Sequence, residues 1–313
     1  MGSEIGVPLT VTSLLRGAAE TLRTSGSESA RLDAELLLGH VIRAERTALL
    51  AAPDAPVGAD HAQIFRELVA RRADGEPVAY IRGLKEFYGL ALSVDPRALI
   101  PRPETELLVE LGIDRLLRLL TEHARPPDAD PIVAWDVATG SGAVCVALAV
   151  ESRRRGYVPE VRFRATDISA DAIALATENA VAHGVADSID LAVVDLADLA
   201  DLASPGASSA DLLLANLPYI PTAVVPNLPV AASYEPVLAL DGGIDGLELV
   251  RRLISLLESA VRNGGVALLE IGAGQADEVR TATAEALPTW DVEFHPDLAG
   301  VPRVVELSRG SGQ

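Results

Sequence analysis

The chain has 313 residues, of which 49% are hydrophobic and 23% charged, which suits two domains or one large one. Its single cysteine, Cys145, excludes an intramolecular disulfide and any metal site built from several cysteines. The formal net charge of −19 disfavours nucleic acid as a partner, because such a surface repels phosphate backbones. No run reaches the roughly 18 apolar residues of a membrane helix, and residues 1–8 lack the pattern of a signal peptide. We therefore expect a cytoplasmic protein with no membrane partner.

The first part of the chain, residues 9–74, has the apolar spacing of helices. One helix is predicted to begin after Thr10 or Thr12, either of which can act as its N-cap, and to end at Gly26. A second has an apolar face over residues 34–41, and Asp60 is predicted to cap a third. Residues 1–84 are thus expected to form a small helical domain.

The next segment changes character. Residues 78–81 are rich in β-prone side chains, and residues 87–94 predict an extended hairpin arm, so we place a hairpin linker at 85–100. The two prolines of residues 100–106 predict a stiff loop. A helix should then begin at Glu104 or Thr105.

From residue 131 onward, strand and helix patterns alternate. Strands are predicted at 132–137, 161–166, 189–194, 210–215 and 265–271, and helices at 142–150, 169–183, 245–262 and 276–286. Residues 292–294 and 304–307 should add an antiparallel pair. Such alternation predicts an α/β domain over 101–313 with a mostly parallel sheet covered on both faces. Ligands then bind at the carboxyl ends of the strands.

A glycine-rich turn follows the first strand of this domain, with the sequence Asp-Val-Ala-Thr-Gly-Ser-Gly-Ala at residues 136–143. Glycines let a ligand approach the backbone, and the helix that follows presents its N-terminus. The turn lacks the third glycine of a dinucleotide fingerprint and the lysine of a P-loop. It is also not a nucleophile elbow, because Thr139 replaces the first glycine of that motif. A tight turn without a ligand is the alternative.

Asp167 stands at the end of the second strand, 25 residues after Gly142. A carboxylate there can accept hydrogen bonds from both ribose hydroxyls of an adenosine ligand. Its alternative role is a helix N-cap, which Ser169 or Asp171 could equally fill. Together with the glycine turn, Asp167 favours an adenosine-type ligand.

The segment Asn-Leu-Pro-Tyr at residues 216–219 decides the chemistry. An apolar strand delivers Asn216 to the ligand side of the sheet, Pro218 fixes the backbone and Tyr219 supplies a flat wall with a polar tip. A turn that only ends the strand is the alternative, since asparagine and proline are common in turns. The preceding glycine turn and Asp167 favour the functional interpretation.

With these motifs the chain resembles the glutamine N5-methyltransferases that modify peptide chain release factors, within the class I S-adenosylmethionine-dependent methyltransferases. The resemblance covers nearly the whole chain. It rests on residues 31–37, 75–81, 86–89, 99–106, 136–143, 216–219 and 235–240. It implies a Rossmann-like seven-stranded sheet, with the N-terminal helical domain joined by the β-hairpin arm and docking the protein substrate.

The resemblance also implies site roles. Asn216, Leu217, Pro218 and Tyr219 would be catalytic: Asn216 Oδ1 and the Leu217 carbonyl would accept the two amide hydrogens of the substrate glutamine. Both acceptors favour the positive charge that develops on nitrogen during transfer. The cofactor S-adenosylmethionine would contact Ala138, Thr139, Gly140, Ser141, Gly142, Asp167, Ile168, Asp195, Leu196, Asn216, Pro103 and Thr105. No metal is expected, because the five histidines show no ligand spacing.

Two residues depart from the family pattern. Ala138 stands where the family usually has glycine, and an alanine is strained there if φ is positive. Leu217 stands where the family usually has proline; it keeps the carbonyl but loses the rigid ring. We expect activity to survive both.

Four other functions fit parts of the pattern. An amino-methyltransferase acting on flipped-out DNA or RNA bases would use the same asparagine, but the net charge opposes it. A glutamine methyltransferase for a ribosomal protein would differ only in its docking surface. A cofactor-binding protein without activity would explain the two departures, and a nicotinamide dehydrogenase fits least, because its fingerprint is incomplete. The acidic residues Asp195, Asp198 and Asp201 are expected to form a solvated loop.

Overall fold

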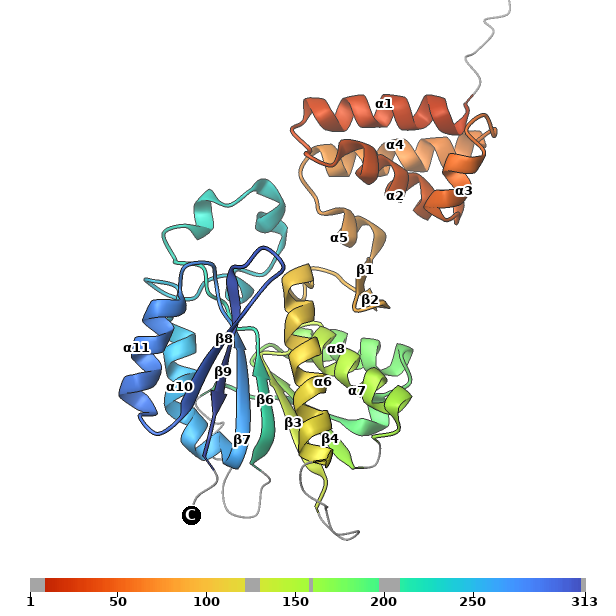
Figure 1. The fold of residues 1–313 in the computed structure, drawn as a ribbon. Helices are drawn as coiled ribbons and strands as arrows, with labels where there is room; N and C mark the ends of the chain where they lie inside the picture. Colours follow the sequence, from red (N-terminus) through yellow and green to blue (C-terminus); the bar gives the residue numbers. More distant parts are fainter. Residues whose placement is uncertain (1–8, 122–129, 158–159, 197–208, 311–313) are drawn as a thin grey trace, which may run out of the picture. The chain divides into compact units, whose positions relative to one another are not determined.

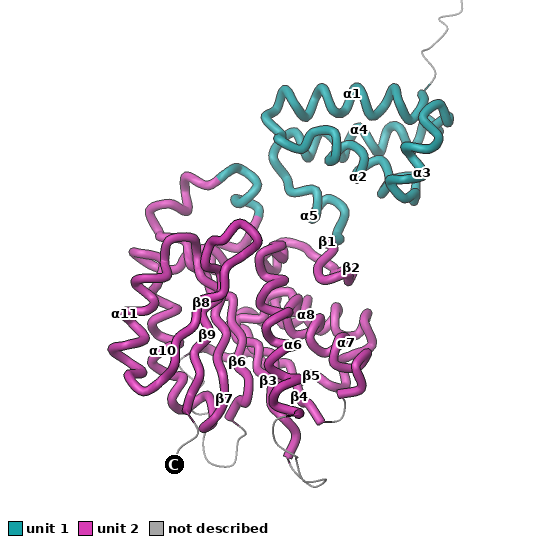
Figure 2. The backbone as a smooth tube through the Cα atoms, in the orientation of Figure 1, with its two compact units in different colours: residues 1–84, 229–234 teal, residues 85–228, 235–313 magenta. Residues whose placement is uncertain are grey.

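The computed structural model describes residues 9–121, 130–157, 160–196 and 209–310. The chain forms two compact units (Figure 2). Unit 1 comprises residues 1–84 and 229–234, and unit 2 comprises residues 85–228 and 235–313. Within the described ranges, no helix is long and apolar enough to cross a membrane.

Unit 1 is helical. Its helices are α1 (Val11–Thr24), α2 (Ala30–Ile42), α3 (Arg46–Ala51), α4 (Ala59–Ala73) and α5 (Val78–Arg82). Their core is built on fully buried side chains that include Leu22, Leu37 and Phe65. Thr10 caps α1, as predicted, because its hydroxyl accepts the backbone N–H of Ser13 at 3.2 Å.

Two predictions for unit 1 are wrong. Asp60 is not a cap: Gly58 is the N-cap residue of α4, and Asp60 lies within the first turn, where its charge still suits the helix dipole. The β-prone residues 78–81 form α5 instead of a strand. Pro77 fixes the entry to this helix, and Gly83, with φ 65°, ends it in the left-handed conformation. Burial of Tyr80 and Ile81 overrides their intrinsic preference for strands.

A downstream segment completes unit 1. The hydroxyl of Tyr234 donates to the carbonyl of Asp74 at 3.4 Å. Gly75 has φ 101°, and a Cβ there would lie 2.5 Å from Val230 Cγ1. Only glycine therefore leaves room for residues 229–234 against the end of α4.

The predicted hairpin is present. Strands β1 (Leu84–Phe87) and β2 (Leu90–Ser93) are joined by a two-residue turn. Both turn residues have positive φ, 49° for Tyr88 and 68° for Gly89, as tight hairpin turns require. The Tyr88 N–H donates to Glu106 Oε1 at 2.8 Å, which fastens the turn to the helix that follows.

Unit 2 contains a seven-stranded sheet in the order β5-β4-β3-β6-β7-β9-β8 (Figure 1). Its strands are β3 (Ile132–Val137), β4 (Val161–Asp167), β5 (Ile189–Val193), β6 (Ala210–Ala215), β7 (Val261–Glu270), β8 (Asp291–Pro296) and β9 (Pro302–Ser308). The strands β3 to β7 pair in parallel, whereas β9 runs antiparallel to both β7 and β8. The strand positions agree with the prediction, although β7 begins four residues early.

Helices cover both faces of this sheet, as predicted. They are α6 (Glu106–Thr121), α7 (Ala143–Arg155), α8 (Ala170–Ala182), α10 (Glu248–Ala260) and α11 (Ala276–Ala286), with short 3-10 turns at 103–105, 186–188, 225–227, 230–234 and 237–239. Alternate residues of each central strand face opposite cores: Ala134 packs with α6 and α7, and Trp135 packs with α10 and α11. The predicted helix 245–262 is shorter, because residues 242–246 include two glycines with positive φ.

Candidate active site

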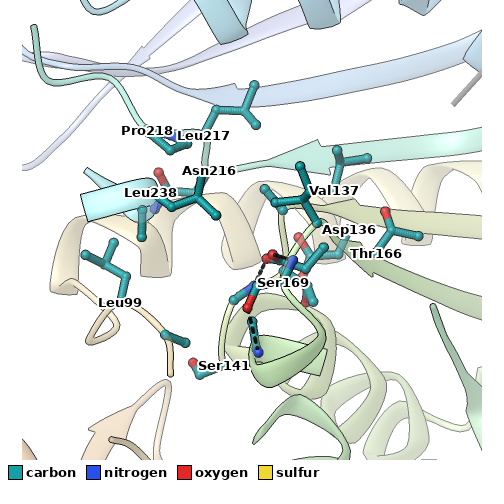
Figure 3. Close-up of a pocket in the computed structure, with 18 of the residues that line it drawn as sticks. Leu99, Asp136, Val137, Ser141, Thr166, Ser169, Asn216, Leu217, Pro218 and Leu238 are labelled. Atoms are coloured by element: carbon teal, nitrogen blue, oxygen red, sulfur yellow. Dashed lines mark hydrogen bonds between the residues drawn. The ribbon is translucent and has the colours of Figure 1, made fainter. Parts of the chain in front are cut away.

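The carboxyl ends of β3, β4 and β6 border a cavity of about 200 Å³ in unit 2. Parallel strands end at the same edge of a sheet, so the turns that follow them meet there. Figure 3 shows Asn216, Leu217 and Pro218 toward the top of this pocket and Ser141 toward the bottom. The predicted residues that line it are Thr105, Ala138, Thr139, Gly140, Ser141, Asp167, Ile168, Asp195, Leu196, Asn216, Leu217 and Pro218.

The glycine turn is held by the neighbouring strand. The backbone N–H of Thr139 donates to the Thr166 carbonyl at 3.0 Å, and the N–H of Gly140 donates to Asp167 Oδ2 at 2.9 Å. Gly142, with φ 79°, is the N-cap of α7. Its hydrogen also packs where a Cβ would come within 3.2 Å of the Ala176 backbone. The turn is thus fixed by β4 and α8 rather than by its own glycines alone.

Asp136, the buried acid at the end of β3, was given no role by the prediction. One of its oxygens, Oδ2, accepts the Thr139 hydroxyl at 2.6 Å and the Cys145 N–H at 3.1 Å. Burial raises the pKa of Asp136 to about 7, and the nearby Asp167 raises it further, against these two hydrogen bonds. A charged residue inside an apolar strand was the sequence signal for it.

Ala138 adopts the left-handed backbone conformation, with φ 58°. This is the case in which alanine is strained, because its Cβ approaches the following carbonyl oxygen. Family members with glycine at this position avoid that contact. The conformation is imposed by the turn, since Thr139 is already bonded to β4.

Asp167 lies where the prediction placed it, at the end of β4 and half-buried at the cavity. Its Oδ1 accepts the Ser169 N–H at 2.9 Å, while Oδ2 accepts Gly140. The N-cap of α8 is Ser169 itself, whose hydroxyl accepts the Ala172 N–H at 3.2 Å. Because each carboxylate oxygen can accept a further hydrogen bond, Asp167 retains acceptor capacity toward the cavity. Burial raises its pKa.

The segment after β5 supplies another wall. Asp195 pairs with Arg252 of α10 at 2.7 Å, and both line the cavity beside apolar Ile168 and Leu196. Asp195 is therefore not simply solvated, as the prediction had it. Asp198 and Asp201 lie outside the described residues.

The proline segment is fastened to the residues that follow unit 1's insertion. Glu235 is buried, and its two oxygens accept Arg102 at 2.6 Å and the Ile100 N–H at 3.1 Å. Arg102 and Pro236 also line the cavity. This ion pair brings two segments distant in sequence together beside the pocket.

Asn216 follows β6 directly, and its amide nitrogen Nδ2 donates to Thr105 Oγ1 at 3.0 Å. Thr105 is buried, so the prediction that it contacts the cofactor needs to accommodate this second partner. Leu217 is 3% exposed and packs into the core formed with α10 and α11. The residue that departs from the family pattern is thus an integral part of the core.

Three predicted residues do not line the cavity: Pro103, Gly142 and Tyr219. Pro103 is exposed at the start of the 3-10 turn before α6. The Tyr219 hydroxyl lies 3.5 Å from Glu270 Oε1, and the Tyr219 carbonyl accepts Gln275 Nε2 at 3.0 Å. Burial raises the pKa of Tyr219 to about 12, with a further contribution from Glu270.

A group of possible metal ligands lies elsewhere in unit 2. Glu293, His295 and Glu306 come within 4.8 Å of one another on β8 and β9. Glu306 is already paired with Arg115 and accepts His295 at 3.1 Å. The guanidinium occupies the place of a cation, so this group is explained as an ion-pair network.

One buried amide connects the glycine turn to the hairpin. Asn179 of α8 is fully buried. Its Nδ2 donates to the carbonyls of Ser93 at 3.0 Å and Ser141 at 2.9 Å, and its Oδ1 accepts the Ser93 N–H at 2.8 Å. Sequence reasoning missed this residue, because an asparagine within a helix has no distinctive spacing.

Comparison with known proteins matches this architecture to a family. Residues 13–83 match the family model of the PrmC N-terminal domain. A release factor glutamine methyltransferase from Moorella thermoacetica is 38% identical over 299 residues, 94% of this chain and 97% of that protein. The chain belongs to the release factor glutamine methyltransferase family. Its counterpart from Bradyrhizobium diazoefficiens is 37% identical, over 96% of this chain and 95% of that protein.

A solved structure of this family is also similar. It is the release-factor-specific protein-(glutamine-N5) methyltransferase from Alicyclobacillus acidocaldarius, 28% identical, covering 70% of this chain and 99% of that chain with a TM-score of 0.42. The family membership confirms the resemblance stated from the motifs. The seven-stranded sheet and the N-terminal helical unit confirm the predicted fold class.

Proposed function

We propose that this methyltransferase transfers a methyl group from S-adenosylmethionine to the side-chain amide nitrogen, N5, of a glutamine in peptide chain release factors. The observation that carries the proposal is the orientation of Asn216, whose Nδ2 is held by Thr105 at 3.0 Å. This contact leaves Oδ1 available as an acceptor at the cavity. Membership of a family whose members are named for this reaction supports the choice of substrate.

The residues around the cavity fit S-adenosylmethionine. Asp167 offers acceptor oxygens to ribose hydroxyls, and apolar Ile168 and Leu196 suit an adenine ring. The turn at 138–142 brings backbone close to the ligand, at the N-terminus of α7. When bound, S-adenosylmethionine supplies a methyl group on a positively charged sulfur.

The chain's own residues must make an amide nitrogen reactive. That nitrogen is a poor nucleophile, because its lone pair is delocalised into the carbonyl. Asn216 Oδ1 and the Leu217 carbonyl would each accept one of its hydrogens and favour the positive charge that develops. They also aim the nitrogen for in-line displacement. The product nitrogen is acidic once methylated and can lose its proton to water.

Leu217 is compatible with this role. The position acts through its backbone carbonyl, which leucine has as well as proline. The family's proline restricts the backbone through its ring. In this chain, the buried Leu217 side chain holds the same segment by packing.

Unit 1 and the hairpin are proposed to dock the protein substrate, with residues 1–84 as the docking domain, 85–100 as the linker and 101–313 as the methyltransferase domain. The match of residues 13–83 to a family-specific N-terminal model supports a role particular to this family. A release factor as substrate places the activity in the cytoplasm. No metal enters the proposed reaction.

Methylation of a defined substrate tests the proposal. Purified protein would be incubated with labelled S-adenosylmethionine and a release factor that lacks its modification, with a ribosomal protein and DNA in parallel. Peptide mass spectrometry should locate a single methyl on one release-factor glutamine. Label on the ribosomal protein or on DNA would instead identify a different substrate. Cofactor binding without any transfer would contradict the proposed activity.

A further inference from the structure

Glu270 is a buried acid at the active-site edge that the proposed reaction does not use. It is the last residue of β7, next to the end of β6, where Ala215 pairs with Leu269. Its side chain is 2% exposed, and among the described residues its Oε2 has no hydrogen-bond partner. It does not line the cavity, so it acts on the reaction through other groups.

The hydrogens available around Thr105 determine how Asn216 is oriented. The side chain of Thr105 forms a hydrogen bond with Glu270. An ionised carboxylate can only accept, so the single hydroxyl hydrogen of Thr105 is committed to Glu270. The Thr105 oxygen can then only accept from Asn216, which must present its amide nitrogen, Nδ2, at 3.0 Å.

We propose that ionised Glu270 is a positioning residue that orients the Asn216 amide through Thr105, so that Asn216 Oδ1 faces the substrate nitrogen. The inference rests on the proposed function for its effect on catalysis. The orientation itself is a property of the free protein. Without this constraint, a half-turn of the amide would present a donor to the substrate hydrogens and remove the acceptor.

Protonation of Glu270 removes the constraint. A neutral carboxyl can donate to Thr105, whose own hydrogen can then point to Asn216 Oδ1 and permit the turned amide. Burial raises the pKa of Glu270 to about 7. Hydrogen bonds from Thr105 and Tyr219 lower it, while Glu104 raises it and Arg303 lowers it by charge. Arg303 is itself paired with Asp297 at 3.0 Å.

The sign of the pH dependence follows. The active orientation requires the ionised form, so it is complete above pH 7 and is lost as the pH falls through about 7. Asp136 at the cavity also has a pKa raised to about 7. A pH profile of the wild-type enzyme therefore needs a Glu270 variant beside it.

Nitrogen-15 NMR of the full chain tests the orientation without any substrate. The side-chain amide signal of Asn216, identified by its loss in Asn216→Ala, should shift with a midpoint near pH 7. Glu270→Gln should abolish this titration. Glu306→Gln neutralises another buried carboxylate, on β9, and should leave the titration unchanged. An Asn216 signal that titrates identically in Glu270→Gln overturns the proposal.

Kinetics with an unmodified release factor provides the second readout. Glu270→Gln should lower kcat by about 10-fold or more, because positioning is lost, while KM for S-adenosylmethionine stays within about twofold. Thr105→Val should reproduce the loss, and Thr105→Ser should retain more activity than Thr105→Val. An unchanged kcat and pH profile in Glu270→Gln would also overturn the proposal. If the wild-type protein methylates no release factor, the proposed function fails, and the NMR titration still decides the role of Glu270.

Discussion

The turns after β3 and β6 both depart from the family pattern, and the structure accommodates the two departures differently. Ala138 after β3 stands in a left-handed conformation, φ 58°, without a compensating change at that residue. Leu217 after β6 replaces the restriction of a proline ring with a side chain that is 3% exposed in the core. One departure costs conformational energy, and the other gains burial.

The difference shows that a turn can be maintained by its surroundings or by its own sequence. The β3 turn keeps its shape because Thr139 and Gly140 are bonded to β4, even though Ala138 disfavours it. The β6 turn is held partly by Leu217 itself. Substitutions in the two turns should therefore act on different properties of the protein.

Removing the Asn216 side chain should have the largest effect. Asn216→Ala loses an acceptor that is most useful in the transition state, so methyl transfer should fall at least about 1,000-fold. Cofactor affinity by calorimetry should change little. The exposed Asn227→Ala is the matched control and should retain full activity. Near-complete turnover by Asn216→Ala would refute the mechanism.

Truncating Leu217 should act on stability. Leu217→Ala should lower the free energy of unfolding by about 2–5 kcal/mol, as expected when a buried leucine leaves a cavity. Urea denaturation would measure it. Leu298→Ala, at a fully exposed position, should change stability by less than about 0.5 kcal/mol. Equal effects of the two substitutions would contradict a core role for Leu217.

Asp167→Ala should weaken cofactor binding by about 1–3 kcal/mol, the range for hydrogen bonds to charged groups. The substitution also frees the N–H groups of Gly140 and Ser169. Calorimetry with S-adenosylmethionine measures the loss, and circular dichroism checks that the fold is retained. Unchanged affinity would show that Asp167 serves only the turn.

Ala138→Gly should have the smallest effect and the opposite sign. Relief of the left-handed strain, partly offset by the greater freedom of glycine in the unfolded chain, should stabilise the protein by about 1 kcal/mol. Ala147→Gly, within α7, is the control and should destabilise it by a similar amount. Thermal denaturation compares the two. Destabilisation by Ala138→Gly would mean that the alanine methyl contributes more than its strain costs.

Much of the fold was predictable, because the periodicity of the sheet domain is strong. The strands at 132–137 and 210–215 have the predicted bounds, since continuous apolar runs end there in polar turns. The residues of α5 were mispredicted, because five residues between Pro77 and Gly83 are too few to show helical periodicity. Short elements depend on tertiary packing, which the sequence pattern does not reveal.

The site was predictable where residue type and position coincide. Asp167 and Asn216 are polar residues at the ends of apolar strands, and both reach the cavity. Asp136 and Glu270 are also acids at strand ends, yet their roles depend on hydrogen-bond partners far away in the sequence. The pairing of Thr105 with Asn216, 111 residues apart, could be found only in three dimensions.

The buried amide of Asn179 gives the hairpin a share in cofactor binding. It bonds Ser93, at the end of β2, and Ser141, in the glycine turn, from one rigid group. A displacement of either segment must therefore break hydrogen bonds to the other in an interior that offers no water as replacement. Strand β2 thus acts as a strut for the turn, and damage to the hairpin should be felt as poorer retention of the methyl donor.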